Sequence, residues 1–189
     1  GWAGGITHYE DLKMVEPVIK RLLDEFSNLN FVFAGFGGIE GKRLINKALF
    51  EDVVFSSIPV ERKEYYNSVE TDWWPRKLQY MDFDIGIAPL IDDEFNHCKS
   101  CCKWIEYSWC KIPSVCSPTV YGRVVKHGKT GFIAHDNQEW YKYLRQLIIS
   151  PALRRKIAKN ARQEVEKKWL LENNWEKWLN CYLEVLNGK

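Results

Sequence analysis

One stretch decides the fold: residues 83–118, FDIGIAPLIDDEFNHCKSCCKWIEYSWCKIPSVCSP. It begins with an apolar run (83–90), continues through a segment with helical spacing, and finishes with a second apolar run, IPSVCS (112–117). Short apolar runs are typical of strands that are buried on both faces of a sheet. A strand, a helix and another strand in this order predict two parallel strands joined by a crossover helix.

The same alternation continues along the rest of the chain. Apolar runs predict further strands over 30–38 (ending in a glycine turn), 53–58 and 130–135. Apolar spacing predicts helices over 9–26, 41–49, 61–69, 76–81, 99–111, 121–128, 137–149, 151–168 and 172–187. We therefore expect an α/β fold, a Rossmann-like doubly wound parallel sheet flanked by helices, in one domain over 1–170 with a helical tail over 171–189.

Composition narrows the class of protein. The net charge is only +2, yet residues 98–189 contain 17 basic and 8 acidic side chains. Such a basic half fits an anionic partner, although basic residues that coat an exposed helix give the same count. Six cysteines, five of them within nineteen residues, are a poor disulfide framework and fit a reducing compartment. No apolar run reaches the roughly 18–20 residues of a membrane span.

The predicted helix over 99–111 carries the main candidate site. Lys99, Lys103, Glu106 and Cys110 are spaced by four, three and four residues, so they share one helical face opposite an apolar one. The amino end of a helix favours phosphate, and the two lysines add charge there. A glutamate two turns deeper can accept hydrogen bonds from ribose hydroxyl groups. We interpret this stripe as a site for a nucleoside diphosphate.

A metal site is the competing interpretation of the same segment. Cys98 and Cys101 have the C-x2-C spacing of zinc ligands, and His97 and Cys102 lie beside them. A second pair at zinc-finger distance is missing from the sequence. Unpaired cysteines are commonly small buried hydrophobic residues. We therefore expect no metal here.

Ligands of doubly wound sheets bind outside the carboxyl ends of the strands, which adds candidates elsewhere. Gly4 and Gly5 form either a loop that approaches phosphate or an ordinary left-handed turn. His8 is either a neighbour of that phosphate or a surface histidine. Backbone near Ser57 and Val60 is expected to contact the base. The glycine-rich opening lacks the strand that normally precedes such a turn, so we expect a piece of a longer protein.

Several ordered segments make the chain resemble the carboxyl-terminal domain of a GT-B glycosyltransferase. The nearest group is family 4, whose members are retaining enzymes that use nucleotide sugars. The segments that carry this resemblance are GWAGGITHYEDL (1–12), FVFAGFG (31–37), residues 83–118, VVKHGKTGFIA (124–134) and EWYKYLRQLIISPALRRKIAKNA (139–161).

The resemblance implies roles for individual residues. Two glutamates separated by seven residues straddle this helix in the family, and Glu106 matches the second, which binds the ribose. The first, associated with the transferred sugar, is replaced here by Cys98. A bacterial surface-polysaccharide branch has Phe-Asn-x-x-Lys-Ser-x-x-Lys, which implies Phe95, Asn96 and Lys99 as donor-site residues. The family's basic pair after the first strand is absent.

The resemblance also implies what the protein does. We expect transfer of a sugar, with retained configuration and without a cofactor or metal, from a nucleoside diphosphate to a glycan or lipid-linked acceptor. The enzyme is expected in the cytoplasm, with peripheral association at the inner face of the membrane left open, and without a nucleic-acid partner. The amino-terminal GT-B domain is missing, so this chain alone should bind donor and transfer nothing. A nucleotide-sugar-binding module without transferase activity is the alternative, and an epimerase is a third.

Two aromatic segments are interpreted structurally. DWWP (72–75) is tempting as a platform for a sugar, but we favour a corner between helices that packs two indoles. Trp175, Trp178 and Tyr182 form an apolar stripe on the last helix. We favour docking of that stripe on the domain's own core. Contact with the missing domain or with a membrane surface stays open.

Overall fold

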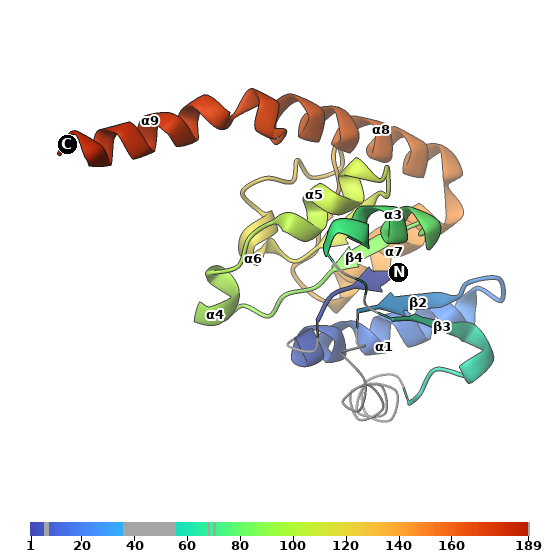
Figure 1. The fold of residues 1–189 in the computed structure, drawn as a ribbon. Coiled ribbons are helices and arrows are strands. Elements are labelled where there is room, and N and C mark those ends of the chain that lie inside the picture. Colours follow the sequence, from blue (N-terminus) through green and yellow to red (C-terminus); the bar gives the residue numbers. More distant parts are fainter. Residues whose placement is uncertain (6–7, 36–55, 68, 70, 189) are drawn as a thin grey trace.

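The computed structural model describes all residues except 6–7, 36–55, 68, 70 and 189 (Figure 1). Its strands are β1 (Trp2–Ala3), β2 (Phe31–Ala34), β3 (Lys63–Tyr66), β4 (Gly86–Ala88), β5 (Ser114–Cys116) and β6 (Phe132–Ile133). Its α-helices are α1 (Tyr9–Glu25), α3 (Trp74–Tyr80), α4 (Glu94–His97), α5 (Cys102–Trp109), α6 (Pro118–Tyr121), α7 (Asn137–Ile149), α8 (Pro151–Lys168) and α9 (Trp175–Leu186). Short 3-10 helices are η2 (Val60–Arg62), η3 (Thr71–Trp73) and η4 (Leu171–Asn173).

The strands form two parallel ladders that meet at the first residue. One ladder has the order β1-β2-β3 and the other β4-β5-β6. Gly1 joins them, because its amino group donates to the Ile85 carbonyl at 2.7 Å and its carbonyl accepts from the Ile87 amide at 2.9 Å. The sheet therefore runs β3-β2-β1-β4-β5-β6, the strand order of a doubly wound Rossmann fold. The predicted fold class is confirmed.

Each face of the sheet carries its own core. Side chains alternate along the strands, so that Trp2 points to one face and Ala3 to the other. The Trp2 face packs on α1 and α7, and the opposite face packs on α3, α5 and α6. Both cores are closed by α8, through Ile157 on the first side and Val165 on the second. This burial on two sides explains why the strands read as short apolar runs.

The predicted helices over 137–149 and 151–168 are confirmed at both ends as α7 and α8. Local signals set these ends. The Asp136 carboxylate accepts the Glu139 amide at 2.9 Å, and the Ser150 hydroxyl accepts the Leu153 amide at 3.2 Å. Such caps satisfy backbone amides that have no partner in the first helical turn.

The segment around the third strand was predicted wrongly. Within the predicted helix 61–69, residues 61–66 form the end of η2 and strand β3, which pairs with β2. β3 lies at the edge of the sheet and is only partly buried, so its sequence KEYY lacks the apolar run expected of a strand. Residues 56–58 of the predicted strand 53–58 form a turn and a bend. The predicted helix 41–49, the first half of the strand 53–58 and the part of the glycine turn after Gly35 lie outside the described residues.

The helices predicted over 99–111 and 121–128 differ from the structure. The predicted helix 99–111 begins only at Cys102, after a separate turn of helix, α4, so Lys99 precedes α5. The predicted helix 121–128 is also wrong. Helix α6 begins earlier, with Pro118 in its first turn, and ends at Tyr121; the residues after it form turns that end in a bridge at His127.

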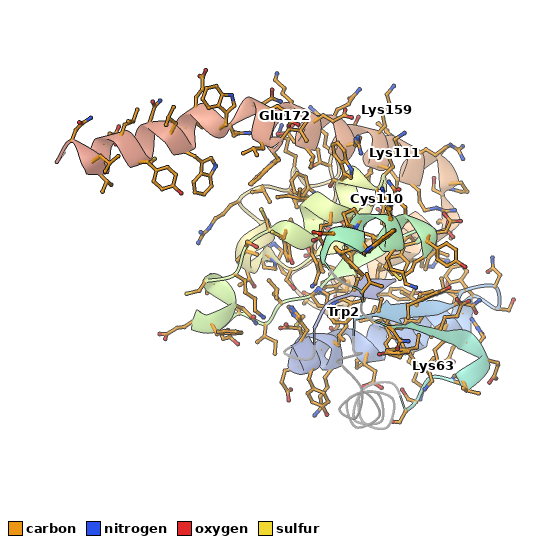
Figure 2. The ribbon with its side chains drawn as sticks, in the orientation of Figure 1. Trp2, Lys63, Cys110, Lys111, Lys159 and Glu172 are labelled. Carbon is orange, nitrogen blue, oxygen red and sulfur yellow. The ribbon has the colours of Figure 1, made fainter. Side chains whose placement is uncertain are left out.

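The last helix extends beyond the rest of the domain (Figures 1 and 2). No residue of α9 is buried against the described chain, and Trp175, Trp178 and Tyr182 are 50%, 62% and 62% exposed. The favoured prediction, that this stripe docks on the domain's own core, is therefore not what the structure shows. None of the described helices is long and apolar enough to cross a membrane.

Candidate functional site

A pocket of about 370 Å³ lies at the carboxyl ends of β1 and β4. Three chain segments converge there: the turn after β1, the segment after β4, and α5. The lining residues are Ala3, Gly4, His8, Trp74, Leu90, Lys99, Ser100, Cys102, Lys103, Glu106 and Tyr121. The structure thus brings together five residues predicted from the sequence: Gly4, His8, Lys99, Lys103 and Glu106.

The ammonium of Lys103 is unusually desolvated for a lysine. It lies over the Trp2 ring, 5.2 Å from the centroid, and directly against Gly4. A Cβ at Gly4 would come within 2.6 Å of the Trp2 ring and 2.7 Å of Lys103 Nζ, so glycine leaves the space that these two side chains occupy. Burial lowers the Lys103 pKa from its ordinary 10.5 to about 8, although the negative charge of Glu106 opposes that change.

Lys99 supplies a second buried ammonium. Its Nζ finds no hydrogen-bond partner among the described residues, and it lies 3.8 Å from Asp11 Oδ2 and 4.7 Å from the centre of the Phe95 ring. Buried charges in proteins are normally paired or hydrogen-bonded, because desolvation is costly. Two ammonium groups that converge on one pocket therefore favour an anionic ligand.

A buried carboxylate organises the wall behind these lysines. Asp11, in the first turn of α1, is 2% exposed. Its Oδ2 lies 2.7 Å from His8 Nδ1, and its Oδ1 accepts the Ile91 amide at 2.8 Å and Asn96 Nδ2 at 3.1 Å. Burial opposes ionisation of Asp11, but the hydrogen bonds from His8 and Ile91 outweigh it and hold the carboxyl pKa below its ordinary value.

The pKa of His8 is lowered, whereas a salt bridge ordinarily raises the pKa of a histidine. Burial lowers its pKa most strongly, and the positive charges of Lys103 and Lys99 lower it further. The hydrogen bond to Asp11 acts against these causes but does not reverse them. The imidazole is therefore neutral at pH 7, with Nδ1 donating to the carboxylate and Nε2 left as an acceptor.

Asn96 and Phe95 lie beside the pocket and do not line it. Asn96 is 3% exposed and joins Asp11 to the Ile91 carbonyl, to which its Nδ2 donates at 3.0 Å. Its Oδ1 is buried and has no hydrogen-bond partner among the described residues. Phe95 is 64% exposed and covers Lys99 from outside. Asn96 acts as a support for Asp11, which the sequence alone did not show.

The remaining predicted residues lie outside this pocket. Gly5 is exposed, and a Cβ there would meet open space. The Ser57 hydroxyl donates to Glu16 Oε1 at 2.9 Å, and Val60 is 77% exposed. Cys98 is exposed at the end of α4. Their predicted contacts with a ligand stay predictions.

Sequence reasoning missed three contributors to the site. Asp11 carried no signal except its place three residues after His8. Trp74 lines the pocket, although DWWP was interpreted as a corner that packs two indoles; its neighbour Trp73 is 57% exposed. Tyr107 is fully buried, and its hydroxyl joins the Ala3 amide to the Ile87 carbonyl, at 3.2 and 3.3 Å. It thereby holds β1 beside β4.

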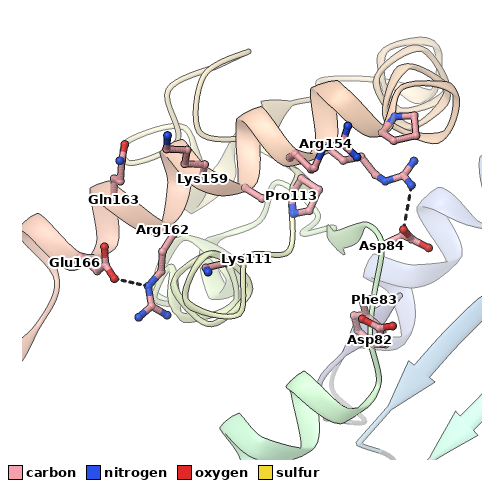
Figure 3. A pocket seen from close by; sticks show the side chains of 13 residues that line it. Asp82, Phe83, Asp84, Lys111, Pro113, Arg154, Lys159, Arg162, Gln163 and Glu166 are labelled. Atoms are coloured by element: carbon pink, nitrogen blue, oxygen red, sulfur yellow. Dashed lines mark hydrogen bonds and ion pairs between the residues drawn. The ribbon is translucent and has the colours of Figure 1, made fainter.

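A larger pocket of about 700 Å³ lies under α8, away from these residues (Figure 3). It is basic, but much of its charge is already paired. Arg154 bonds Asp84, and Arg162 bonds Glu166 and lies over the Trp109 ring. Among the described residues, moreover, no group of three potential metal ligands is found.

Comparison with known families gives one match. Residues 46–180 match the model of a family described as glycosyl transferase-like. This range covers Lys99 and helix α5 with Lys103 and Glu106, but begins after Asp11. No curated protein matches the chain.

Solved structures resemble the chain over most of its length, at low identity. TarM is 18% identical, with a TM-score of 0.69, and the match covers 95% of this chain and 34% of TarM. The C-terminal domain of a group 1 glycosyl transferase from Francisella tularensis is 16% identical, with a TM-score of 0.64 and coverages of 89% and 84%. Anabaena HepE in complex with UDP-glucose is 13% identical, with a TM-score of 0.65 and coverages of 100% and 49%. The chain thus has the fold of these proteins and spans a third to a half of the longer ones.

Proposed function

Because the chain belongs to the glycosyl transferase-like family, we propose that it is the donor-binding half of a glycosyltransferase. Its ligand is a nucleoside diphosphate sugar. One observation carries the proposal: Lys99 and Lys103 bring two desolvated ammonium groups, of which the Lys99 group has no hydrogen bond within the described chain, to a pocket that also contains the Glu106 carboxylate. The solved relative HepE contains UDP-glucose and has the same fold.

Each group of the pocket fits one part of this ligand. The diphosphate lies between the two ammonium groups and the turn at Gly4, where no side chain projects into the pocket. Glu106 accepts the two ribose hydroxyls. The fixed positive charges stabilise the diphosphate as it leaves the sugar, without reorganisation of solvent.

The reaction we propose is retaining transfer of a hexose, of the family 4 type, without a bound metal. The acceptor is a glycan or a lipid-linked sugar of a bacterial surface polysaccharide, and the enzyme works at the cytoplasmic face of the membrane. An acceptor-binding domain completes the enzyme, and the apolar stripe of α9 is a candidate surface to receive it. This chain alone then binds donor but does not transfer sugar.

A second candidate is a binding module that transfers nothing. It is favoured by Cys98, which occupies the position of the family's sugar-associated glutamate and lies exposed outside the pocket. A thiol is a poor substitute for a carboxylate as a hydrogen-bond acceptor. Sugar transfer by the full-length protein, measured with the donor identified below, decides between the two candidates.

Calorimetric titration of the domain tests the proposal. UDP, GDP, dTDP and CDP, and the corresponding nucleotide sugars, are titrated into the wild type and into Glu106→Ala. One base should bind selectively, and Glu106→Ala should weaken that binding by about 1.5–3 kcal/mol, because hydrogen bonds to a charged acceptor are lost. Glu176→Ala, an exposed helical glutamate on α9, is the matched control and should bind like the wild type.

Two results would contradict the proposal. If no nucleotide binds at millimolar concentration to this domain or to the full-length protein, the pocket does not bind the proposed ligand. Equal binding by the wild type and Glu106→Ala would mean that the nucleotide binds at another site and that the polar face of α5 only contacts solvent.

A further inference from the structure

We propose that Asp11 is a positioning residue of the pocket, which sets His8 to receive a proton when a diphosphate binds. The inference rests on the proposed function, because it concerns the same pocket and ligand. It assigns a role to two residues that lie before the matched family region. It also predicts a measurable event, the uptake of a proton on binding.

The Asp11 carboxylate connects segments that are far apart in the sequence. Asp11 belongs to α1, but its partners come from both walls of the pocket. His8 lies in the turn after β1, whereas Ile91 and Asn96 follow β4, about 80 residues later in the chain. The same carboxylate lies 3.8 Å from Lys99 Nζ. One buried group thus fixes the distance between the two walls.

The orientation of the His8 imidazole is fixed by two contacts. Because Nδ1 is bound to Asp11 at 2.7 Å, the other ring nitrogen, Nε2, is the one available to a ligand in the pocket that His8 lines. The edge of the Trp2 ring packs against the imidazole, with ring centres 5.7 Å apart, and restricts its rotation. An imidazole held in this way presents a single, defined nitrogen.

Four charged side chains surround His8. Asp11 faces it from α1, and Lys99, Lys103 and Glu106 share the pocket with it from α5 and the segment before α5. Burial, and after it the charges of the two ammonium groups, keep the free imidazole neutral. A diphosphate that pairs with them removes this repulsion and offers Nε2 an anionic oxygen, so the bound state favours imidazolium. The proton comes from the solvent and remains on Nε2, hydrogen-bonded to phosphate.

Proton uptake is the readout that a merely structural role would not produce. The probe is UDP-glucose, or the nucleotide sugar that the titration above identifies, because its diphosphate is esterified at both ends and does not titrate near neutral pH. Calorimetry at pH 6.5 in two cationic buffers of different ionisation enthalpy, imidazole and bis-Tris, counts protons taken up on binding. We expect uptake approaching one proton per ligand, with affinity that falls by up to about tenfold per pH unit as pH rises.

The variants separate the two residues. His8→Gln keeps a hydrogen-bonding side chain but cannot titrate, so uptake at pH 6.5 should vanish and affinity should no longer depend on pH between 5.5 and 6.5. Lys103 contributes little in this range, because its pKa of about 8 lies well above it. Asp11→Asn should weaken binding roughly tenfold or more and reduce the uptake. Asp24→Asn, at the exposed end of the same helix, is the control and should match the wild type.

The outcomes distinguish this inference from the proposed function. Binding without proton uptake, or with the same uptake in His8→Gln, would refute the role of His8 while leaving the pocket its ligand. If Asp11→Asn fails to fold, His8→Gln alone still decides. Failure of every nucleotide sugar to bind would overturn both proposals.

Discussion

Replacement of Lys103 by methionine should stabilise the free domain and impair its binding of nucleotide. The two effects have one cause. The Lys103 ammonium lies in a pocket wall against Gly4 and Trp2, where no hydrogen-bond acceptor among the described residues compensates for the lost water. Methionine keeps the length of the side chain and its contact with the Trp2 ring, but carries no charge.

The pKa of Lys103 sets the size of the effect. A decrease from 10.5 to about 8 means that folding disfavours the charged form by about 3 kcal/mol. This penalty is fully present below pH 8, where Lys103 is protonated in both the folded and the unfolded chain. Between pH 8 and 10.5 the unfolded chain holds the proton more tightly, so the wild type gains stability as pH rises. Lys103→Met should therefore raise the unfolding free energy by about 2–3 kcal/mol at pH 7 and by less than about 1 kcal/mol at pH 10.

Urea unfolding at the two pH values measures the first effect, and calorimetry with nucleoside diphosphates measures the second. Loss of a charged hydrogen bond to phosphate should weaken binding by about 1.5–3 kcal/mol. Lys159→Met, at an exposed position of α8, is the matched control and should change each quantity by less than about 0.5 kcal/mol. A destabilised Lys103→Met domain, or one whose stability gain is the same at both pH values, would refute the reasoning.

Three further changes test the fold. Tyr107→Phe leaves the buried Ala3 amide and Ile87 carbonyl without their partner, so urea unfolding should show a loss of about 1–3 kcal/mol; an unchanged midpoint would contradict the link between β1 and β4. Asp136→Ala removes the cap of α7 and should cost about 1 kcal/mol in the same assay, whereas Asp136→Ser should recover most of it. Deletion of residues 171–189 should move the thermal midpoint by only a few degrees, since no residue of α9 is buried; a cooperative loss of structure would show that the tail supports the core.

Much of the fold could be predicted because its signals are local. The cap at Asp136 and the Ser150-Pro151 pair mark the starts of α7 and α8 in a few residues each. The central strands are buried on both faces and therefore appear as apolar runs. β3 was not predicted for the opposite reason. It lies at the edge of the sheet and is only partly buried, so it has no apolar run, and Lys63–Tyr66 form a strand because they pair with β2.

Helical spacing predicted the part of the site that lies on α5, whereas contacts between distant segments carried no sequence signal. Lys103 and Glu106 lie three residues apart on α5, and helical spacing alone places them together. Asp11 meets Ile91 and Asn96 across about 80 residues, and no periodicity in the sequence reports such a contact. The prediction for α9 failed for a similar reason. An apolar stripe indicates that a surface is covered in the complete protein, but it does not indicate which part of the protein covers it.

The charges of the described pocket explain how it can hold two buried ammonium groups without a ligand. Lys99 and Lys103 are balanced by the Glu106 carboxylate in the pocket and by Asp11 behind it. A nucleotide sugar adds about two negative charges and upsets that balance. The amide groups at the amino end of α5 offset part of the excess, and a proton on His8 offsets another unit. A pocket that is neutral when empty thus needs a group able to gain charge on binding, and the imidazole held by Asp11 is placed to be that group.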